Sequence, residues 1–118
     1  MKLSVIIPAY NAAATLSEAL HSVEQQHVQP FEVVVVNDGS TDDTERVVQS
    51  FMDRLPLVCV HQENAGLGAA RNAGMRAATG AAWVSLDADD VWGSNKLAHA
   101  RDRMMRLPKV QWFSPPIL

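Results

Sequence analysis

Residues 31–40 read FEVVVVNDGS, in which four consecutive valines at positions 33–36 run into a polar turn. A continuous β-branched run, without alternating polar residues, is typical of a parallel strand that is covered on both faces. Shorter apolar runs of the same kind recur along the chain. We predict strands at residues 3–8, 31–37, 57–61 and 82–87, with a weaker candidate at residues 110–113.

Helical patterns separate these predicted strands. The apolar residues that share a helical face are Leu16, Leu20 and Val23; Val47, Val48 and Phe51; and Leu97, Ala100 and Met104. Residues 67–78 are rich in Ala and Gly, which suits a helix that packs closely against a sheet. We expect Ser40 and Ser94 to cap helices, with Asp42 and Asp43 in a first turn and the last helix ending near Pro108. This alternation predicts a Rossmann-like α/β domain, in which helices cover a mainly parallel sheet.

Composition limits the classes of protein to consider. The chain has 118 residues, enough for one domain at 1–118, and its 47% hydrophobic and 19% charged residues are ordinary for a globular protein. The net charge is −3 and no predicted face carries a Lys/Arg cluster, which argues against nucleic acid as a partner. Cys59 is the only cysteine and lies in an apolar run, so we expect a buried thiol. Without a signal-peptide pattern or a membrane-length apolar segment, we expect a cytoplasmic protein.

Unusual polar residues follow the predicted strands. In open α/β sheets, ligands bind outside the carboxyl ends of the strands, near the point where strand order reverses. The first predicted strand ends at Tyr10 and Asn11, the second at Asp38, and the fourth at a group of aspartates. The sequence therefore predicts that an aromatic ring and several carboxylates meet at one edge of the sheet.

The aspartates are Asp87, Asp89 and Asp90. Carboxylates this close repel one another, so they favour a cation or a raised pKa. Mg²⁺ and Mn²⁺ sites use one or two carboxylates together with substrate phosphates. The alternative is that Asp90 caps a turn and the other two are solvated loop charges. Their place after a buried run favours the metal.

Two other candidates have structural alternatives. Tyr10 can stack on a base, or be a half-buried tyrosine at a strand end. Asp38 can accept a hydrogen bond from a base edge, or form an Asx-type turn with the following glycine.

Residues 66–71 imitate a dinucleotide-binding loop. They read GLGAAR, which departs from G-x-G-x-x-G at its last position, Arg71, and follows the third predicted strand instead of the first. An arginine prevents the close helix–strand packing that the third glycine allows, which argues against a dehydrogenase. Arg71 instead suits a cation that faces a phosphate or the aspartates, with a surface salt bridge as the alternative.

With these residues described, the chain resembles the family 2 glycosyltransferases of the GT-A fold over nearly its whole length. Four segments carry the resemblance, in the family's order and spacing. They are residues 4–11 (SVIIPAYN), 36–44 (VNDGSTDDT), 64–74 (NAGLGAARNAG) and 86–90 (LDADD).

The resemblance implies a role for each site residue. Pro8, Ala9 and Tyr10 would line the nucleobase pocket, Asp38 would hydrogen-bond the base, and Arg71 would lie near the nucleotide. The segment 87–89 looks like the family's D-x-D motif. Asp87 would face the ribose or the metal, and Asp89 would bind the Mn²⁺ or Mg²⁺ that bridges the diphosphate. The donor implied is a UDP-sugar, and transfer to a carbohydrate or other acceptor hydroxyl would invert the anomeric centre.

Two departures from the family bear on function. Asn37 stands where many relatives carry a further Asp, which leaves Asp38 in place. The family's general base and acceptor-binding segments lie beyond the D-x-D half, so we expect the base beyond Leu118 and assign no catalytic residue. We therefore expect an incomplete domain that is weakly active or inactive alone, with a sheet edge through which it can form a homodimer.

Two other functions stay open at this point. One is a catalytically inert nucleotide-binding or dimerisation domain. The other is a nucleotidyltransferase, which normally has a Gly-rich, basic loop after its first strand; residues 10–14 read YNAAA here.

Overall fold

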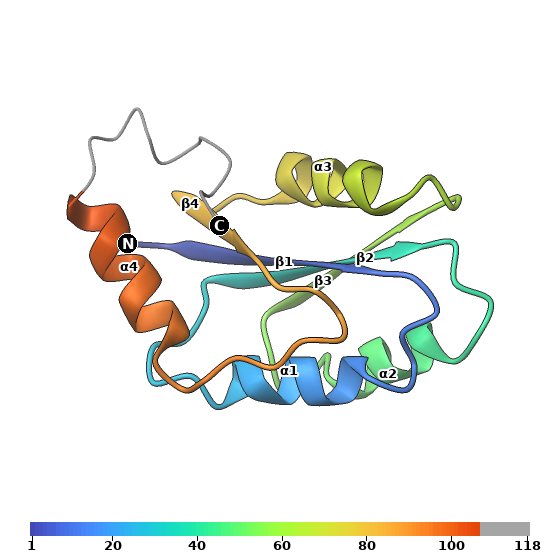
Figure 1. The fold of residues 1–118 in the computed structure, drawn as a ribbon, viewed down its shortest axis with the longest axis horizontal. Helices are drawn as coiled ribbons and strands as arrows, with labels where there is room; N and C mark the ends of the chain where they lie inside the picture. Colours follow the sequence, from blue (N-terminus) through green and yellow to red (C-terminus); the bar gives the residue numbers. More distant parts are fainter. Residues whose placement is uncertain (107–118) are drawn as a thin grey trace.

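The computed structural model describes residues 1–106, which form a single parallel sheet covered by helices (Figure 1). Its strands are β1 (Leu3–Ala9), β2 (Glu32–Asp38), β3 (Leu57–Gln62) and β4 (Ala82–Ser85). They lie in the order β3-β2-β1-β4, and all neighbouring pairs are parallel. The predicted α/β class and strand polarity are confirmed. The predicted strand at 110–113 and the helix end near Pro108 lie outside the described residues.

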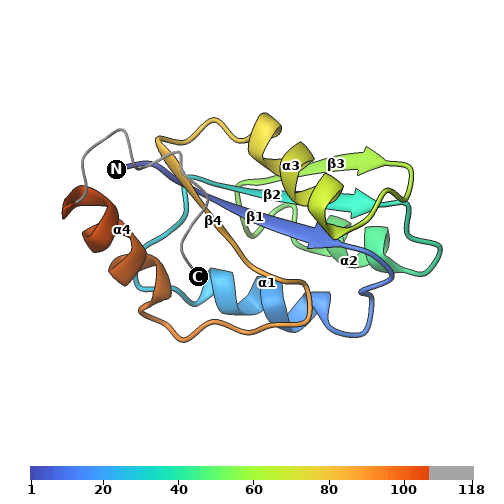
Figure 2. The same ribbon diagram turned by 45° about the horizontal axis from the view of Figure 1, so that its top comes forward.

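Helices cover both faces of this sheet. They are α1 (Leu16–Glu24), α2 (Thr44–Ser50), α3 (Leu67–Ala77) and α4 (Lys96–Arg106). Helices α1 and α2 lie on one face and α3 lies alone on the other, while α4 lies beside the start of β1 (Figures 1 and 2). None of the helices in residues 1–106 has the length and apolar character needed to span a bilayer.

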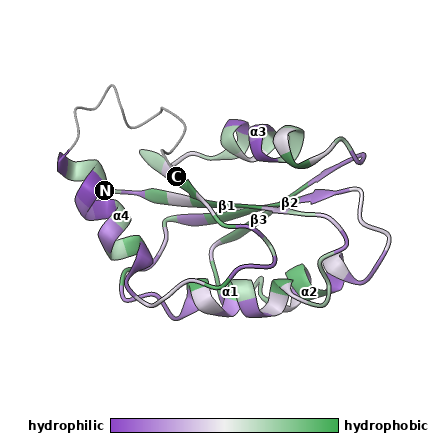
Figure 3. Ribbon diagram, in the orientation of Figure 1, coloured by the Kyte–Doolittle hydropathy of each residue, from purple (hydrophilic) through white to green (hydrophobic). Residues whose placement is uncertain are grey.

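The valines of β2 show why this sequence folds as it does. All four have no exposed surface. Val33 and Val35 belong to the core beneath α1 and α2, whereas Val34 and Val36 pack against Ala70 and Ala73 of α3. Coloured by hydropathy, the sheet is the most apolar layer of the molecule (Figure 3). The expectation of a strand covered on both faces is therefore confirmed.

Helix α3 lies unusually close to the sheet. A Cβ added at Gly74 would be 2.4 Å from Cγ2 of Ile6 and 3.3 Å from Cγ2 of Val36. Only a glycine allows this approach, which confirms the expectation from the Ala- and Gly-rich sequence. The close contact brings Arg71, one turn earlier in the helix, near the strand ends.

Both expected serine caps are wrong. Helix α2 begins at Thr44, and Ser40 Oγ instead accepts a hydrogen bond from the backbone N–H of Asn11 at 3.0 Å. Helix α4 begins at Lys96, where Gln26 Oε1 accepts from the N–H of Leu97 at 2.9 Å. At α4 a group from a distant segment replaces the local cap that the sequence suggested, whereas at α2 the nearby Asp42 Oδ1 accepts from the N–H of Thr44 at 3.0 Å.

Two further expectations need correction. Strand β4 ends at Ser85 instead of residue 87; Leu86 N–H still donates to Ile6, after which the chain turns and Asp87 lies in a loop. Cys59 is half-buried because β3 is an edge strand, with a neighbouring strand on one side only. Burial nevertheless raises the pKa of its thiol.

Helix α4 carries a basic stripe that the sequence analysis missed. Lys96, His99, Arg103 and Arg106 are all exposed, and their spacing places them on one helical face. Two of them, Arg103 and Arg106, lie in the last turn, where positive charge complements the helix dipole.

Candidate functional site

The predicted site residues gather at the carboxyl-terminal edge of the sheet. In the order β3-β2-β1-β4, the chain moves from β1 to β2 and β3, and then crosses back to place β4 on the other side of β1. The strand order therefore reverses between β1 and β4, the place where open α/β sheets bind their ligands. Residues that follow β1, β2 and β4 border this switch point.

The aspartates after β4 form the candidate metal centre. Asp87, Asp89 and Asp90 are exposed, and each offers a carboxylate oxygen within 4.8 Å of the others. A turn with a hydrogen bond from Asp90 N–H to Asp87 O at 3.0 Å brings them together. Hard, exposed carboxylate oxygens converging from one short loop are the donor set that Mg²⁺ and Mn²⁺ prefer. These residues therefore fit a divalent cation.

Arg71 connects this centre to α3. Its Nη2 lies 3.8 Å from Oδ1 of Asp87, and the two side chains are 33% and 49% exposed. At this exposure the pair contributes little to stability. The pair instead fixes a position, since it holds one positive charge beside the three carboxylates.

Asp38 organises the loop that leads into α3. It is 2% exposed, and its carboxylate accepts from Gln62 Nε2 at 2.8 Å, Ala65 N–H at 2.9 Å and Gly66 N–H at 3.0 Å. Burial raises the pKa of Asp38, but these hydrogen bonds outweigh burial and hold the pKa below its usual range. The carboxylate is therefore ionised at neutral pH and acts only as an acceptor.

The turn after β2 is closed by the side chain of Asn37, and not by the Asx-type turn at Asp38 that the sequence offered as an alternative. Asn37 Oδ1 accepts from Ser40 N–H at 3.1 Å, so the carboxylate of Asp38 is free to face the loop at residues 62–66. Asn64 Nδ2 donates to the backbone oxygen of Asp38 at 3.1 Å. The sequence analysis missed Gln62 and Asn64, because only the pairing of β2 with β3 brings them beside Asp38.

The loop after β1 is fastened to the loop after β2. Asn11 has a positive φ of 46°, and its Oδ1 accepts from Thr41 N–H at 2.8 Å. Ala12 N–H donates to Thr44 Oγ1 at 2.9 Å, and Ala13 N–H donates to Asp42 Oδ2 at 3.1 Å. These bonds hold the backbone on the carboxyl side of Tyr10.

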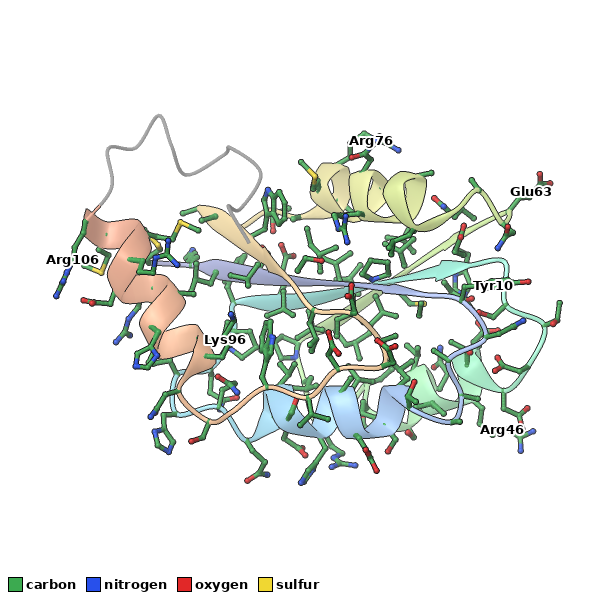
Figure 4. The ribbon with its side chains drawn as sticks, viewed as in Figure 1. Tyr10, Arg46, Glu63, Arg76, Lys96 and Arg106 are labelled. Atoms are coloured by element: carbon green, nitrogen blue, oxygen red, sulfur yellow. The ribbon has the colours of Figure 1, made fainter. Side chains whose placement is uncertain are left out.

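The three residues expected to line a base pocket differ in accessibility. Tyr10 is 53% exposed at the carboxyl-terminal end of the sheet, where Figure 4 shows it with Glu63 near the end of β3. Pro8 pairs in register with Val36 and so shares the α3 face. Ala9 is buried in the core beneath α1 and α2, so its backbone is the part available on the α3 side.

The site thus has two parts along one edge. Asp38 and the loop at 62–66 form one, and Arg71 with the three aspartates forms the other. Among residues 1–106, no hydrogen bond or ion pair links Tyr10 or Asp38 to the aspartates. The fold and this edge together define an open α/β domain of the ligand-binding type.

Comparison with known proteins names the family. The profile of glycosyl transferase family 2 matches residues 4–114, so the chain belongs to this family of transferases. An uncharacterized glycosyltransferase of Nostoc sp. is 46% identical over 99 residues, which cover 82% of this chain and 31% of that protein. The Escherichia coli glycosyltransferase YibD is 41% identical over 90 residues, covering 75% of this chain and 26% of YibD.

Solved structures agree with the sequence comparisons. TarS from S. aureus, in complex with UDP-GlcNAc, has a TM-score of 0.83 at 34% identity, covering 90% of this chain and 32% of TarS. The mannosyltransferase PcManGT from Pyrobaculum calidifontis, in complex with GDP-Man and Mn²⁺, has a TM-score of 0.78 at 33% identity. The match covers 99% of this chain and 33% of PcManGT. The chain spans about a third or less of the length of the relatives it matches.

Proposed function

We propose that this domain binds a nucleotide-diphospho-sugar, with uridine as the nucleoside, through Mn²⁺ or Mg²⁺. The observation that carries the proposal is the convergence of Asp87, Asp89 and Asp90 at the switch point of the sheet, with Arg71 beside them. Family membership and the nucleotide-sugars bound by TarS and PcManGT support it.

Each side chain then has a defined task. Tyr10 is exposed and free to stack on the base, Pro8 and the backbone of Ala9 border it, and Asp38 accepts a hydrogen bond from it. Asp87 faces the ribose or the metal, and Asp89 binds the metal as the second aspartate of a D-x-D motif. A divalent cation held by these carboxylates would supply positive charge to offset the negative charge of the leaving nucleoside diphosphate.

The acceptor side of the reaction is part of the same proposal. We propose inverting transfer to an acceptor hydroxyl, with a carboxylate general base outside the donor-binding half. The 118-residue chain alone is then expected to bind the donor with weak or no transfer. A homodimer formed through a sheet edge and a cytoplasmic location stay predictions.

Calorimetric titration of UDP tests the donor site. The wild-type chain is expected to bind UDP in the presence of Mn²⁺ and much more weakly without it. Asp89→Ala should remove the dependence on metal, whereas Asp53→Ala, an exposed aspartate between α2 and β3, should not. Metal-independent binding, or no binding by a chain whose circular dichroism shows it folded, would contradict the proposal.

A further inference from the structure

The carboxylate of Asp38 has few acceptor positions left for a ligand. A carboxylate offers about four lone-pair positions, two on each oxygen. Oδ1 already accepts two donors, Gln62 Nε2 at 2.8 Å and Ala65 N–H at 2.9 Å. Both positions on this oxygen are therefore filled before any ligand binds.

Oδ2 accepts one short hydrogen bond and one long one. It accepts from Gly66 N–H at 3.0 Å. Asn64 Nδ2 lies 3.5 Å away, and its shorter bond, at 3.1 Å, goes to the backbone oxygen of Asp38. The Asn64 bond is the longest at this carboxylate, so its position on Oδ2 is the one that an incoming donor can most readily take over.

Of the two donors to Oδ1, the side chain of Gln62 is the one that a substitution can remove. The parallel register pairs Asp38 with Gln62, so the two side chains leave the same face of the sheet at the ends of neighbouring strands. A carboxylate can only accept, so the amide nitrogen of Gln62 must face it. The other donor to Oδ1 is a backbone N–H, which no side-chain substitution removes.

We propose that Gln62 determines base specificity, by leaving Asp38 able to accept one donor from the base instead of two. This inference rests on the proposed function, in which Asp38 contacts the nucleobase. Uracil presents a single donor, N3–H, on its pairing edge, and the weakly held position on Oδ2 matches it. Guanine presents two adjacent donors, N1–H and N2–H, which need both oxygens of a carboxylate.

The energetic consequence follows from burial. Asp38 is 2% exposed, so a guanine donor that found Oδ1 occupied would lose water without gaining a partner. Leaving such a donor unpaired costs enough to lower affinity about tenfold. Gln62 thereby favours a uridine over a guanosine donor.

The test compares two nucleotides that differ only in the base. UDP and GDP are titrated, each with Mn²⁺, into the wild-type chain and into Gln62→Ala, with Glu63→Ala as the control on the next, exposed residue. The wild type should prefer UDP. Gln62→Ala opens the second position on Oδ1, so the preference should fall about tenfold while the control keeps it.

The ratio of the two affinities separates this role from a structural one. If Gln62 only supported the loop, its loss would weaken UDP and GDP equally, and an unchanged ratio overturns the inference. Gln62→Ser provides a second variant, too short to reach Oδ1, and should behave like Gln62→Ala. If the folded wild type binds neither nucleotide, the proposed function fails; if it binds UDP and the ratio does not move in either variant, only the role of Gln62 fails.

Discussion

The two ends of the sheet each carry carboxylates, but in opposite states. At the amino end, Glu32 is 8% exposed and accepts from Ser4 Oγ at 2.6 Å, from Thr79 Oγ1 at 3.1 Å and from Thr79 N–H. At the carboxyl end, Asp87, Asp89 and Asp90 are exposed and close together, with Arg71 as the neighbouring cation.

This difference separates a structural carboxylate from the aspartates that we propose to bind a ligand. Glu32 ties the start of β1 to the turn before β4, and its hydrogen bonds compensate for its burial. The three aspartates keep their oxygens open, at the expense of mutual repulsion. Asp38 lies between these cases, with most of its acceptor positions filled by its own loop. The number of hydrogen bonds that each carboxylate already accepts therefore distinguishes the acid that supports the fold from those proposed to bind a ligand.

The largest expected effect is on stability at the amino end. Glu32→Gln keeps the size of the side chain but turns an NH₂ group toward donors, which leaves buried groups unpaired and should cost about 2 kcal/mol of unfolding free energy. Urea denaturation measures this loss, with Glu18→Gln on the exposed face of α1 as the matched control. UDP affinity of the folded fraction should not change. A loss of affinity would show that the two ends are coupled.

The same carboxylate predicts a dependence on pH. Burial raises the pKa of Glu32, but hydrogen bonds from Ser4 and Thr79 outweigh burial and place it below 4.5. Because folding lowers the pKa of Glu32, the stabilisation that its ionised carboxylate contributes is fully present above the unfolded pKa of 4.5. This stabilisation is lost as the pH falls through the pKa of the folded state. The difference in unfolding free energy between wild type and Glu32→Gln should therefore shrink on acidification below pH 4.5. A difference that stays constant into acid would assign the stabilisation to packing.

Arg71 should affect binding more than folding. Arg71→Ala removes the cation beside Asp87 and should weaken UDP binding about tenfold in the presence of Mn²⁺. Its effect on unfolding free energy should stay below about 1 kcal/mol, since the ion pair is partly exposed. Arg76→Ala, in the last turn of the same helix, is the control. Equal losses of affinity in the two variants would indicate nonspecific charge attraction.

The smallest effect concerns repulsion among the aspartates. Asp90→Asn removes one of three like charges, so without metal its melting temperature should equal or slightly exceed that of the wild type. Saturating Mn²⁺ should stabilise the wild type more than the variant, because binding to the folded state adds stability. Calorimetric melting with and without Mn²⁺ checks both parts. A variant that gains as much from Mn²⁺ as the wild type would exclude Asp90 from the metal centre.

Sequence patterns predicted the elements well where one strong local signal dominates. The valines at 33–36 allow only a strand covered on both faces, and the glycine at 74 agrees with the close contact of α3. Predictions failed where a distant group competes with a local one. Ser40 looks like a cap of α2, but its hydroxyl accepts from the N–H of Asn11 instead. Ser94 looks like a cap of α4, but Gln26 accepts the hydrogen bond at the start of that helix.

For the candidate site, the sequence by itself determined which functional groups are present: an aromatic ring, an acidic turn and an arginine near the ends of apolar runs. Their motifs follow one another in the order found in glycosyltransferase family 2. Local periodicity is enough for this, because parallel strands bring their carboxyl ends to one edge. Only the tertiary structure decided how each acid is satisfied. The register of β2 with β3 places Gln62 against Asp38, and α3 brings Arg71 to Asp87. Hydrogen-bond saturation depends on groups that are distant in sequence, so no local pattern encodes it.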